Sequence, residues 1–232
     1  MARVPLENPA RIVDLGCGAG NVSAILKRRF PAADVLGVDG SPAMIAKARS
    51  TAPDCRFEQA DLGAWRPDAS PDLIFSNAAL HWLVGHGALF PGLVGLLAAG
   101  GCLAVQMPLM HAEPLRALQY EVAAQGPWAE RLQGVGSAPA ILTPGEYWDM
   151  LRPRVAALEL WETIYLHPLR GEDAVTEWAA GSSLRPFLDA LDDDHRTLFR
   201  RAYSEALRPH YPRRVDGTTL LPFRRLFLLA RI

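Results

Sequence analysis

A strand, a glycine-rich loop and a helix are expected in succession near the start of this chain, within residues 12–30. A short apolar run with one acidic residue, over residues 12–15, leads into a loop whose glycines stand at every second position, Gly16, Gly18 and Gly20. Apolar residues then recur at helical spacing, at Val22, Ile25, Leu26 and Phe30. Glycine allows a sharp turn and a close approach of the backbone to a ligand, because it has no Cβ. This order of elements predicts a nucleotide-type ligand at the loop.

The composition narrows the class of protein. Half of the 232 residues are apolar, which is enough for one good core or one domain with a sizeable elaboration. The net charge of −1 gives no overall electrostatic attraction for nucleic acid or an anionic membrane. No apolar run has the length of a membrane span. No signal peptide is expected ahead of Asp14. Three scattered cysteines and dispersed histidines predict reduced thiols in a cytoplasmic protein, and no metal site.

Residues 11–107 alternate between strand and helix patterns. Short apolar runs bounded by turn residues predict strands at 11–15, 34–39, 55–60, 72–76 and 102–107. Helices are expected at 21–30, 42–51 and 87–99. Ser41 and Pro42 are a typical helix start, since serine caps and proline takes the first helical position. Repeated strand–helix units predict a parallel sheet with right-handed crossovers, and thus an α/β fold.

The pattern changes after residue 107. Helices are expected at 113–125 and 143–151, a strand at 155–166, a long helical stretch from about 171 to 210, and a last strand at 226–232. Helices inserted late between sheet strands emerge where ligands bind in open α/β sheets, so they predict a lid. Within one compact domain we expect a core over 1–110, a first lid insertion over 111–154, a sheet strand over 155–167, a second lid insertion over 168–222 and a last strand over 223–232.

Three acidic residues stand at successive strand ends: Asp14, Asp39 and Asp61. An acidic residue at the position of Asp39 can accept both hydroxyls of a ribose. A carboxylate at Asp61 can meet an adenine amino group. Each acid alone is as often a turn or cap residue, but three in succession favour ligand binding. The GxGxG spacing differs from the GxGxxG of dinucleotide enzymes.

The loop over residues 14–21, together with Asp39 and Asp61, resembles the class I methyltransferases that bind S-adenosyl-L-methionine. The resemblance implies a Rossmann-like fold with a mostly parallel seven-stranded sheet and an inserted helical lid. It places the glycines against the methionine part of the cofactor and Asp14 near its ammonium group. The residues implied to bind the cofactor are Asp14, Gly16, Cys17, Gly18, Gly20, Asp39, Gly40, Ser41, Met44, Ala60, Asp61, Leu62, Asn77 and Trp82.

Several later stretches resemble one family within that superfamily, the trans-aconitate 2-methyltransferases. They are residues 2–8, 41–46, 72–78, 103–108, 184–187 and 225–227. Two departures stand out. The triplet His81-Trp82-Leu83 replaces the Gln-Trp-Leu that is common in the family. The family also has a segment ahead of residues 3–6, with a helix that helps to cover the cofactor, and that segment is not part of this sequence.

The implied reaction is methyl transfer to a carboxylate, which gives a monomethyl ester. A carboxylate is already ionised at pH 7, so no general base is needed. The protein has to align the reacting atoms, exclude water and anchor the other carboxylates, which predicts a clamp of arginine, tyrosine or backbone donors. We expect no catalytic acid–base residue, although His81 could serve as a base for a hydroxyl acceptor. The residues expected to bind the substrate are Arg185, Arg225, Tyr165, Tyr203 and His81.

Plainer interpretations stay open for some of these residues. Trp82 and Met44 could be core residues, and Arg185 could lie on a solvated helix face. An enzyme of the same fold could also methylate another small acid or a hydroxyl, because fold does not determine the acceptor. A weakly active or non-catalytic form is a further alternative, given the absent covering segment. We expect a small tricarboxylate partner, no nucleic acid, no membrane, and a monomer or homodimer.

Overall fold

The computed structural model describes residues 3–136 and 141–232; Ala2, in the first matched stretch, lies outside them. The chain forms two compact units. Unit 1 contains residues 1–108, 139–162 and 226–232, and unit 2 contains residues 109–138 and 163–225. Two long strands, β6 (Ala157–Arg170) and β7 (Thr218–Arg231), contribute residues to both units. Each unit is described by itself below.

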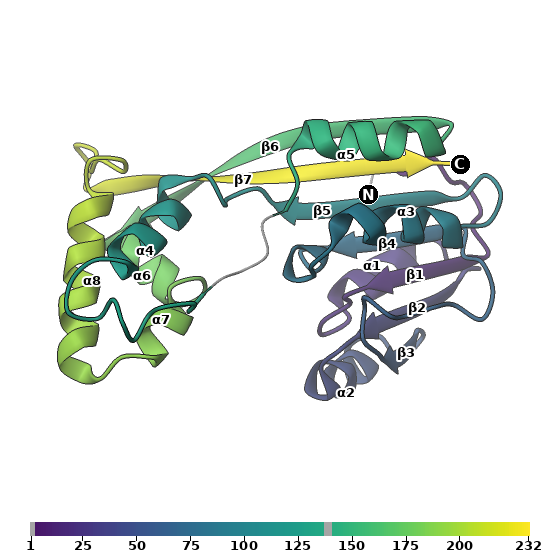
Figure 1. The fold of residues 1–232 in the computed structure, drawn as a ribbon. Helices are drawn as coiled ribbons and strands as arrows, with labels where there is room; N and C mark the ends of the chain where they lie inside the picture. Colours follow the sequence, from purple (N-terminus) through teal and green to yellow (C-terminus); the bar gives the residue numbers. More distant parts are fainter. Residues whose placement is uncertain (1–2, 137–140) are drawn as a thin grey trace. The chain divides into compact units, whose positions relative to one another are not determined.

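Unit 1 is built on the first five strands of a seven-stranded mixed sheet, whose order is β3-β2-β1-β4-β5-β7-β6 (Figure 1). The pairings of β1 with β2 and β4, of β2 with β3, and of β4 with β5 are all parallel. The predicted strands are confirmed to within one residue at each end. They are β1 (Arg11–Leu15), β2 (Asp34–Asp39), β3 (Arg56–Gln59), β4 (Leu73–Asn77) and β5 (Cys102–Pro108).

Four helices and a short 3-10 turn connect and cover these strands. They are α1 (Asn21–Arg29), α2 (Pro42–Thr51), η1 (Leu80–Trp82), α3 (His86–Leu96) and α5 (Pro144–Leu151). Helix α1 packs with α2, and α3 packs with α5. Figure 1 shows α3 and α5 on the near face of the sheet and α1 on the far face. The cap predicted at Ser41 is present, since its side chain accepts a hydrogen bond from the backbone N–H of Met44.

Helix α5 shows how unit 1 differs from the expected insertion pattern. We expected residues 111–154 as one lid insertion, but residues 139–162 belong to unit 1. The reason is apolar packing: Tyr147 and Leu151 of α5 are fully buried, and the Tyr147 ring lies 4.8 Å from that of Phe90 in α3. Helix α5 therefore covers the sheet, whereas α4 (Pro114–Ala123) belongs to unit 2.

The strand order places a crevice beside β1. Strand β1 has β2 on one side and β4 on the other, so the order of the strands reverses there. In open α/β sheets, ligands bind at such a switch point, outside the carboxyl ends of the strands. The register pairs Asp14 with both Gly37 and Phe75, so these three strands end near one another.

Unit 2 is mostly helical, with α4, α6 (Ala174–Ala180), α7 (Arg185–Asp189) and α8 (Asp193–Leu207) around one core. The single helical stretch expected over 171–210 is wrong, because it is three helices. Asp192 explains the last break: its side chain accepts a hydrogen bond from the N–H of His195 and starts α8 as a new helix. Fully buried rings of Phe187, Phe199 and Tyr203 form the centre of the core.

Strand β7 begins at Thr218, eight residues before the position expected from the sequence (226 − 218). The prediction stopped short because Pro222 lacks an N–H and is uncommon inside strands, and because two charged residues, Arg224 and Arg225, precede the apolar run. The strand continues because its backbone finds partners outside the local sequence. The carbonyl of Arg224 accepts from the N–H of Leu109, for example, at 2.9 Å. In residues 3–136 and 141–232, no helix has both the length and the apolarity needed to cross a membrane.

Candidate functional site

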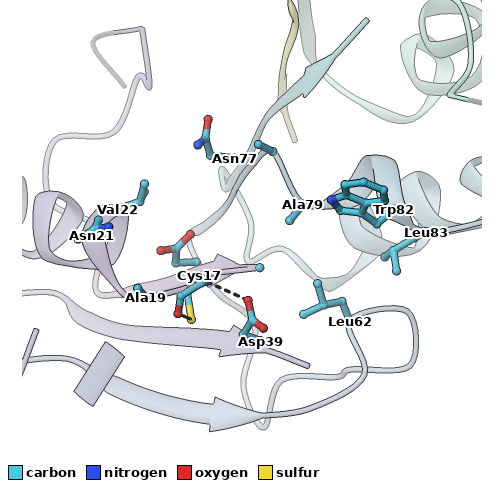
Figure 2. Close-up of a pocket in the computed structure, with 14 residues that line it drawn as sticks. Cys17, Ala19, Asn21, Val22, Asp39, Leu62, Asn77, Ala79, Trp82 and Leu83 are labelled. Carbon is cyan, nitrogen blue, oxygen red and sulfur yellow. Dashed lines mark hydrogen bonds between the residues drawn. The ribbon is translucent and has the colours of Figure 1, made fainter. Parts of the chain in front are cut away.

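A pocket of about 450 Å³ lies at the carboxyl ends of β1, β2 and β4, where the topology places the crevice. All of its lining residues belong to unit 1. Figure 2 shows the loop after β1 at the centre, with side chains from the ends of β2 and β4 and from η1 around it. The lining residues are Asp14, Gly16, Cys17, Gly18, Ala19, Asn21, Val22, Asp39, Leu62, Asn77, Ala78, Ala79, Trp82 and Leu83.

The glycine loop forms the floor of the pocket. Its backbone is held against β2, and the conformation and the close packing at Gly16 both require glycine. The N–H groups of Gly16 and Cys17 both donate to the carbonyl of Val38, at 2.8 and 3.0 Å, which ties the loop to β2. Gly16 has a φ of +85°, and a Cβ built there would lie 2.1 Å from the Cβ of Ala79. The backbone of the loop therefore approaches the segment after β4 more closely than any other residue type permits.

Asp39 is the polar side chain that organises the β2 edge of the pocket. One of its oxygens accepts from the N–H of Gly18 and the other from the N–H of Ser41, each at 2.9 Å (Figure 2 shows the first bond). Two backbone donors thus fix the plane of the carboxylate. Because each carboxylate oxygen can accept two hydrogen bonds, both oxygens retain capacity for ligand hydroxyls.

Asp14 is a buried acid at the end of β1, with 1% of its surface exposed. Its carboxylate accepts a 2.6 Å hydrogen bond from the hydroxyl of Ser23 in α1. Burial raises the pKa of Asp14 to about 6; the Ser23 hydrogen bond lowers this pKa, and the nearby charge of Asp39 raises it. A cationic group in the pocket would favour the ionised form of Asp14, because opposite charge compensates for desolvation.

The segment after β4 forms the opposite wall. Ala78 has a φ of 54°, the one positive value for a non-glycine residue in the described part of the chain, and its N–H donates to the carbonyl of Gln106 at 2.9 Å. This bend turns the chain from Asn77 into η1. Trp82 is 65% exposed and lines the pocket, so the alternative that it is a core residue is wrong.

Six residues expected at the cofactor do not line this pocket. Gly20 caps α1 with a φ of 82°, Ser41 caps α2, and the Asp61 carboxylate accepts from the N–H of Gly63 at 2.9 Å in a local turn. Met44 is 42% exposed, so it is not a core residue. The six are Gly20, Gly40, Ser41, Met44, Ala60 and Asp61.

Other lining residues had not been singled out from the sequence. Each lies within two residues of a predicted one, in the glycine loop, at the start of α1 or after β4, so proximity in sequence was the available signal. These residues are Ala19, Asn21, Val22, Ala78, Ala79 and Leu83.

Four of the five residues expected at the substrate belong to unit 2, and His81 belongs to unit 1. Tyr203 is fully buried, and its hydroxyl donates to the carbonyl of Leu115 at 2.6 Å, so it is part of the core of unit 2. Arg185 is exposed and pairs with Asp189 at 3.4 Å, one helical turn away. The guanidinium of Arg225 lies 5.6 Å from the ring centre of Tyr165.

Comparison of sequences shows relatives along the whole chain. A family profile described as "Methyltransferase domain" matches residues 12–101. The chain is 47% identical to the trans-aconitate 2-methyltransferase of Methylobacterium radiotolerans, over 100% of this chain and 90% of that protein. Proteins of the same name are 45% identical in Variovorax paradoxus and 44% identical in Escherichia coli, each over 100% of this chain and 90% of the relative.

Solved structures resemble the fold. The YcgJ protein from Bacillus subtilis superposes with a TM-score of 0.66 at 16% identity, over 99% of this chain and 94% of that one. An S-adenosylmethionine-dependent methyltransferase from Mesorhizobium loti gives 0.53 at 24% identity, over 99% and 94% of the two chains. Likeness at these identities concerns the fold alone, and it confirms the expected Rossmann-like α/β architecture.

Proposed function

The chain belongs to the trans-aconitate 2-methyltransferase family, and on that premise we propose that it transfers a methyl group from S-adenosyl-L-methionine to a carboxylate of trans-aconitate. The product is the monomethyl ester. The observation that carries this proposal is the identity of 43–47% to proteins of that name along the full chain. The methyltransferase-type pocket in unit 1 supports it.

The residues of the pocket fit S-adenosyl-L-methionine. The glycine loop offers backbone without Cβ atoms, which suits the methionine part of the cofactor, and buried Asp14 would compensate its ammonium group. Asp39, held by two backbone donors, would accept the ribose hydroxyls. Leu62, Leu83 and Trp82 would provide an apolar wall for the adenine. When bound, the cofactor supplies a methyl group on a positively charged sulfur.

Beyond binding the cofactor, the protein is proposed to promote methyl transfer by positioning the acceptor and excluding water. The acceptor carboxylate is ionised at neutral pH, so the chain does not have to remove a proton. Aligning an acceptor oxygen with the methyl carbon can lower the barrier by roughly 7–11 kcal/mol in favourable cases. We propose that Asn77 and the bend at Ala78 form the side of the pocket nearest the reacting sulfur, because they close the end of β4.

The partner is proposed to be a small molecule only. The net charge of −1 supports this, since it offers no general attraction for nucleic acid. We further propose a cytoplasmic enzyme that acts as a monomer or homodimer. Light scattering of the purified protein would determine which of the two forms is present.

Methyl transfer to a panel of acids tests the function. The purified protein with S-adenosyl-L-methionine is given trans-aconitate, cis-aconitate, citrate and a simple fatty acid, and the esters are measured by mass spectrometry. We expect trans-aconitate to be the best acceptor. Turnover of a fatty acid or a hydroxyl compound alone would establish the alternative acceptor class, and the absence of turnover with every tricarboxylate would overturn the proposal.

A binding measurement separates a wrong acceptor from a defective cofactor site. S-adenosylhomocysteine is titrated calorimetrically into the protein and into the variant Asp39→Ala. Tight binding that is lost in the variant supports the cofactor site described above. The absence of binding by the unmodified protein would favour the weakly active or non-catalytic alternative.

A further inference from the structure

Ser23 is a polar residue in a fully buried position in the first turn of α1. The two residues before it, Asn21 and Val22, line the proposed cofactor pocket (Figure 2), whereas Ser23 itself does not. A buried hydroxyl costs free energy unless it forms a hydrogen bond. The partner of Ser23 therefore indicates what this residue does at the edge of the pocket.

That partner is Asp14 at the end of β1. The hydroxyl of Ser23 donates to Oδ2 of Asp14 at 2.6 Å, a length typical of a hydrogen bond to a carboxylate. A serine hydroxyl has one hydrogen, so this bond excludes the alternative bond to a carbonyl of the preceding turn, which serines in helices can form. Ser23 thus connects α1 to the carboxylate of Asp14, which lines the pocket.

The ionisable groups on the elements around Asp14 include one acid, two thiols and one lysine. Asp39 of β2 brings a second negative charge, which raises the pKa of Asp14. Burial raises the pKa of Cys17 to about 12 and also raises the pKa of Cys55, so both thiols are neutral at pH 7. Lys27, one turn further along α1, donates to a backbone carbonyl at 2.7 Å.

Ser23 favours the ionised form of Asp14. Burial has the larger effect and raises the pKa of Asp14 to about 6, because a buried charge loses its hydration. The hydrogen bonds from Ser23 oppose this effect and lower the pKa. At neutral pH the buried carboxylate is therefore ionised, and it can compensate a cation in the pocket.

We propose that Ser23 is a positioning residue of the cofactor site, which keeps the Asp14 carboxylate ionised for the ammonium group of S-adenosyl-L-methionine. Ser23 acts through Asp14 and does not touch the cofactor. This inference rests on the proposed function, and it adds to the site a residue that does not line the pocket. The alternative is that Ser23 only fills a buried position.

The pH dependence of S-adenosylhomocysteine binding distinguishes these two roles. Ser23→Ala removes the donor, so the pH at which binding weakens should rise by about one pH unit or more, as expected for the loss of a hydrogen bond to a charged group. With a rise of one pH unit, calorimetry should find affinity about fivefold weaker than that of the unmodified protein at pH 6, and nearly unchanged at pH 8.

Ser76→Ala is the matched control. Ser76 of β4 is also fully buried, and its hydroxyl donates at 2.7 Å to the carbonyl of Leu15, the chain neighbour of Asp14. The control therefore removes a similar buried hydrogen bond, but one whose acceptor is neutral. Any change of affinity in Ser76→Ala should be equal at pH 6 and pH 8. Other groups that titrate in this range contribute to both variants alike.

A double variant isolates the action through Asp14. Asp14→Asn has a neutral side chain at this position, so there is no ionisation for Ser23 to support. Adding Ser23→Ala to Asp14→Asn should therefore change the affinity for S-adenosylhomocysteine by less than about twofold at pH 6. A loss as large as in the unmodified background would mean that Ser23 does not act through Asp14.

The stability of the ligand-free protein gives a readout that does not depend on the cofactor. Asp14 is mostly protonated in the folded protein at pH 5 and mostly ionised at pH 8. Because the hydrogen bond stabilises the ionised form, Ser23→Ala should lower the free energy of unfolding more at pH 8 than at pH 5, as measured by urea denaturation. Ser76→Ala should lower it equally at both.

The two readouts separate this inference from the proposed function. If S-adenosylhomocysteine binds, but Ser23→Ala weakens it by the same factor at pH 6 and pH 8, Ser23 has only a packing role and the inference is wrong. If Ser23→Ala shows the pH-dependent loss of stability, but the unmodified protein binds no S-adenosylhomocysteine, Ser23 supports Asp14 and the cofactor assignment is wrong.

Discussion

Two opposing effects act on the ionisation of a single residue, Asp14. Burial penalises its ionised form and raises its pKa to about 6, whereas a cationic ligand group would favour that same ionised form. Because the folded protein binds the proton more tightly than the unfolded chain, ionisation of Asp14 reduces the stability of the ligand-free protein as pH rises from about 4 to about 6. A bound ammonium group would offset that cost.

The affinity for S-adenosylhomocysteine, which carries the same ammonium group, should therefore depend on pH. We expect affinity to fall as pH drops below about 6, because Asp14 becomes protonated. The limiting slope for one such group is about tenfold per pH unit. Asp14→Asn should bind weakly at pH 8 and lose this slope. Calorimetric titration between pH 5 and pH 8 measures both, and an equal slope in the variant would assign the effect to another group.

The first two glycines of the loop offer a matched pair of substitutions. A Cβ at Gly16 would lie 2.1 Å from the Cβ of Ala79, whereas a Cβ at Gly18 would meet nothing within 4 Å. Both have positive φ, which costs alanine about 1–2 kcal/mol. Gly16→Ala should therefore lower the free energy of unfolding more than Gly18→Ala, as measured by urea denaturation. Equal losses would mean that Ala79 moves aside without cost.

Sequence could locate Asp14, Asp39 and the glycines because their pattern is local. It could not predict the partner of Asp14, since Ser23 reaches it only after α1 has packed on the sheet. Sequence also left open whether Trp82 was buried, because an aromatic residue after an apolar strand has the same local pattern in a core and at a pocket rim. Its exposure is a tertiary property.

Elements are held together by a buried His86–Tyr147 pair, which joins the first residue of α3 to α5. One imidazole nitrogen of His86, Nε2, lies 3.0 Å from the carbonyl of Leu80, which can only accept. Nε2 therefore carries the proton, and Nδ1 accepts from the hydroxyl of Tyr147. Since Leu80 begins η1, this pair also supports the wall of the pocket that holds Trp82.

Tyr147→Phe removes the hydroxyl and leaves a buried acceptor on His86. We expect it to lower the free energy of unfolding by about 1–3 kcal/mol. Trp148→Phe in the same helix is the control, because Trp148 is 43% exposed and a change at an exposed position usually costs less than about 0.5 kcal/mol. Urea denaturation of the two variants makes the comparison, and similar losses would contradict a structural role for the buried pair.

Elements with local start signals were predictable, and those that depend on distant partners were not. Helix α2 runs over the predicted residues because Ser41 and Pro42 encode its start. Strand β7 was predicted too short, because its first half includes Pro222 and depends on pairing that no local pattern reveals. The helical stretch after residue 171 looked continuous, because a capping aspartate such as Asp192 resembles any surface acid.

For the whole molecule, every residue that lines the proposed cofactor pocket belongs to unit 1. The cofactor class could be predicted because its loop is contiguous in sequence. The acceptor site could not be predicted in the same way, because the residues expected there are scattered between positions 81 and 225.

Hydrogen exchange should detect the binding of S-adenosylhomocysteine to unit 1. S-adenosylhomocysteine alone should slow amide exchange at the ends of β1, β2 and β4, because its proposed contacts are confined to unit 1. Adding trans-aconitate should then slow exchange in further peptides, and these peptides would identify the acceptor site. Mass spectrometry of peptides from the exchanged protein resolves the two sets. Equal protection of both units by S-adenosylhomocysteine alone would contradict the assignment.

The continuity of β6 and β7 through both units bears on the construction of chimeras. Unit 2 cannot be exchanged between relatives as one loop, because it consists of two segments with four junctions, after residues 108, 138, 162 and 225. The junctions after 162 and 225 fall inside strands, where a shift of one residue would turn every following side chain to the opposite face. Donor segments must therefore match in length parity as well as in sequence, so functional recombinants should arise mainly between parents of equal strand length.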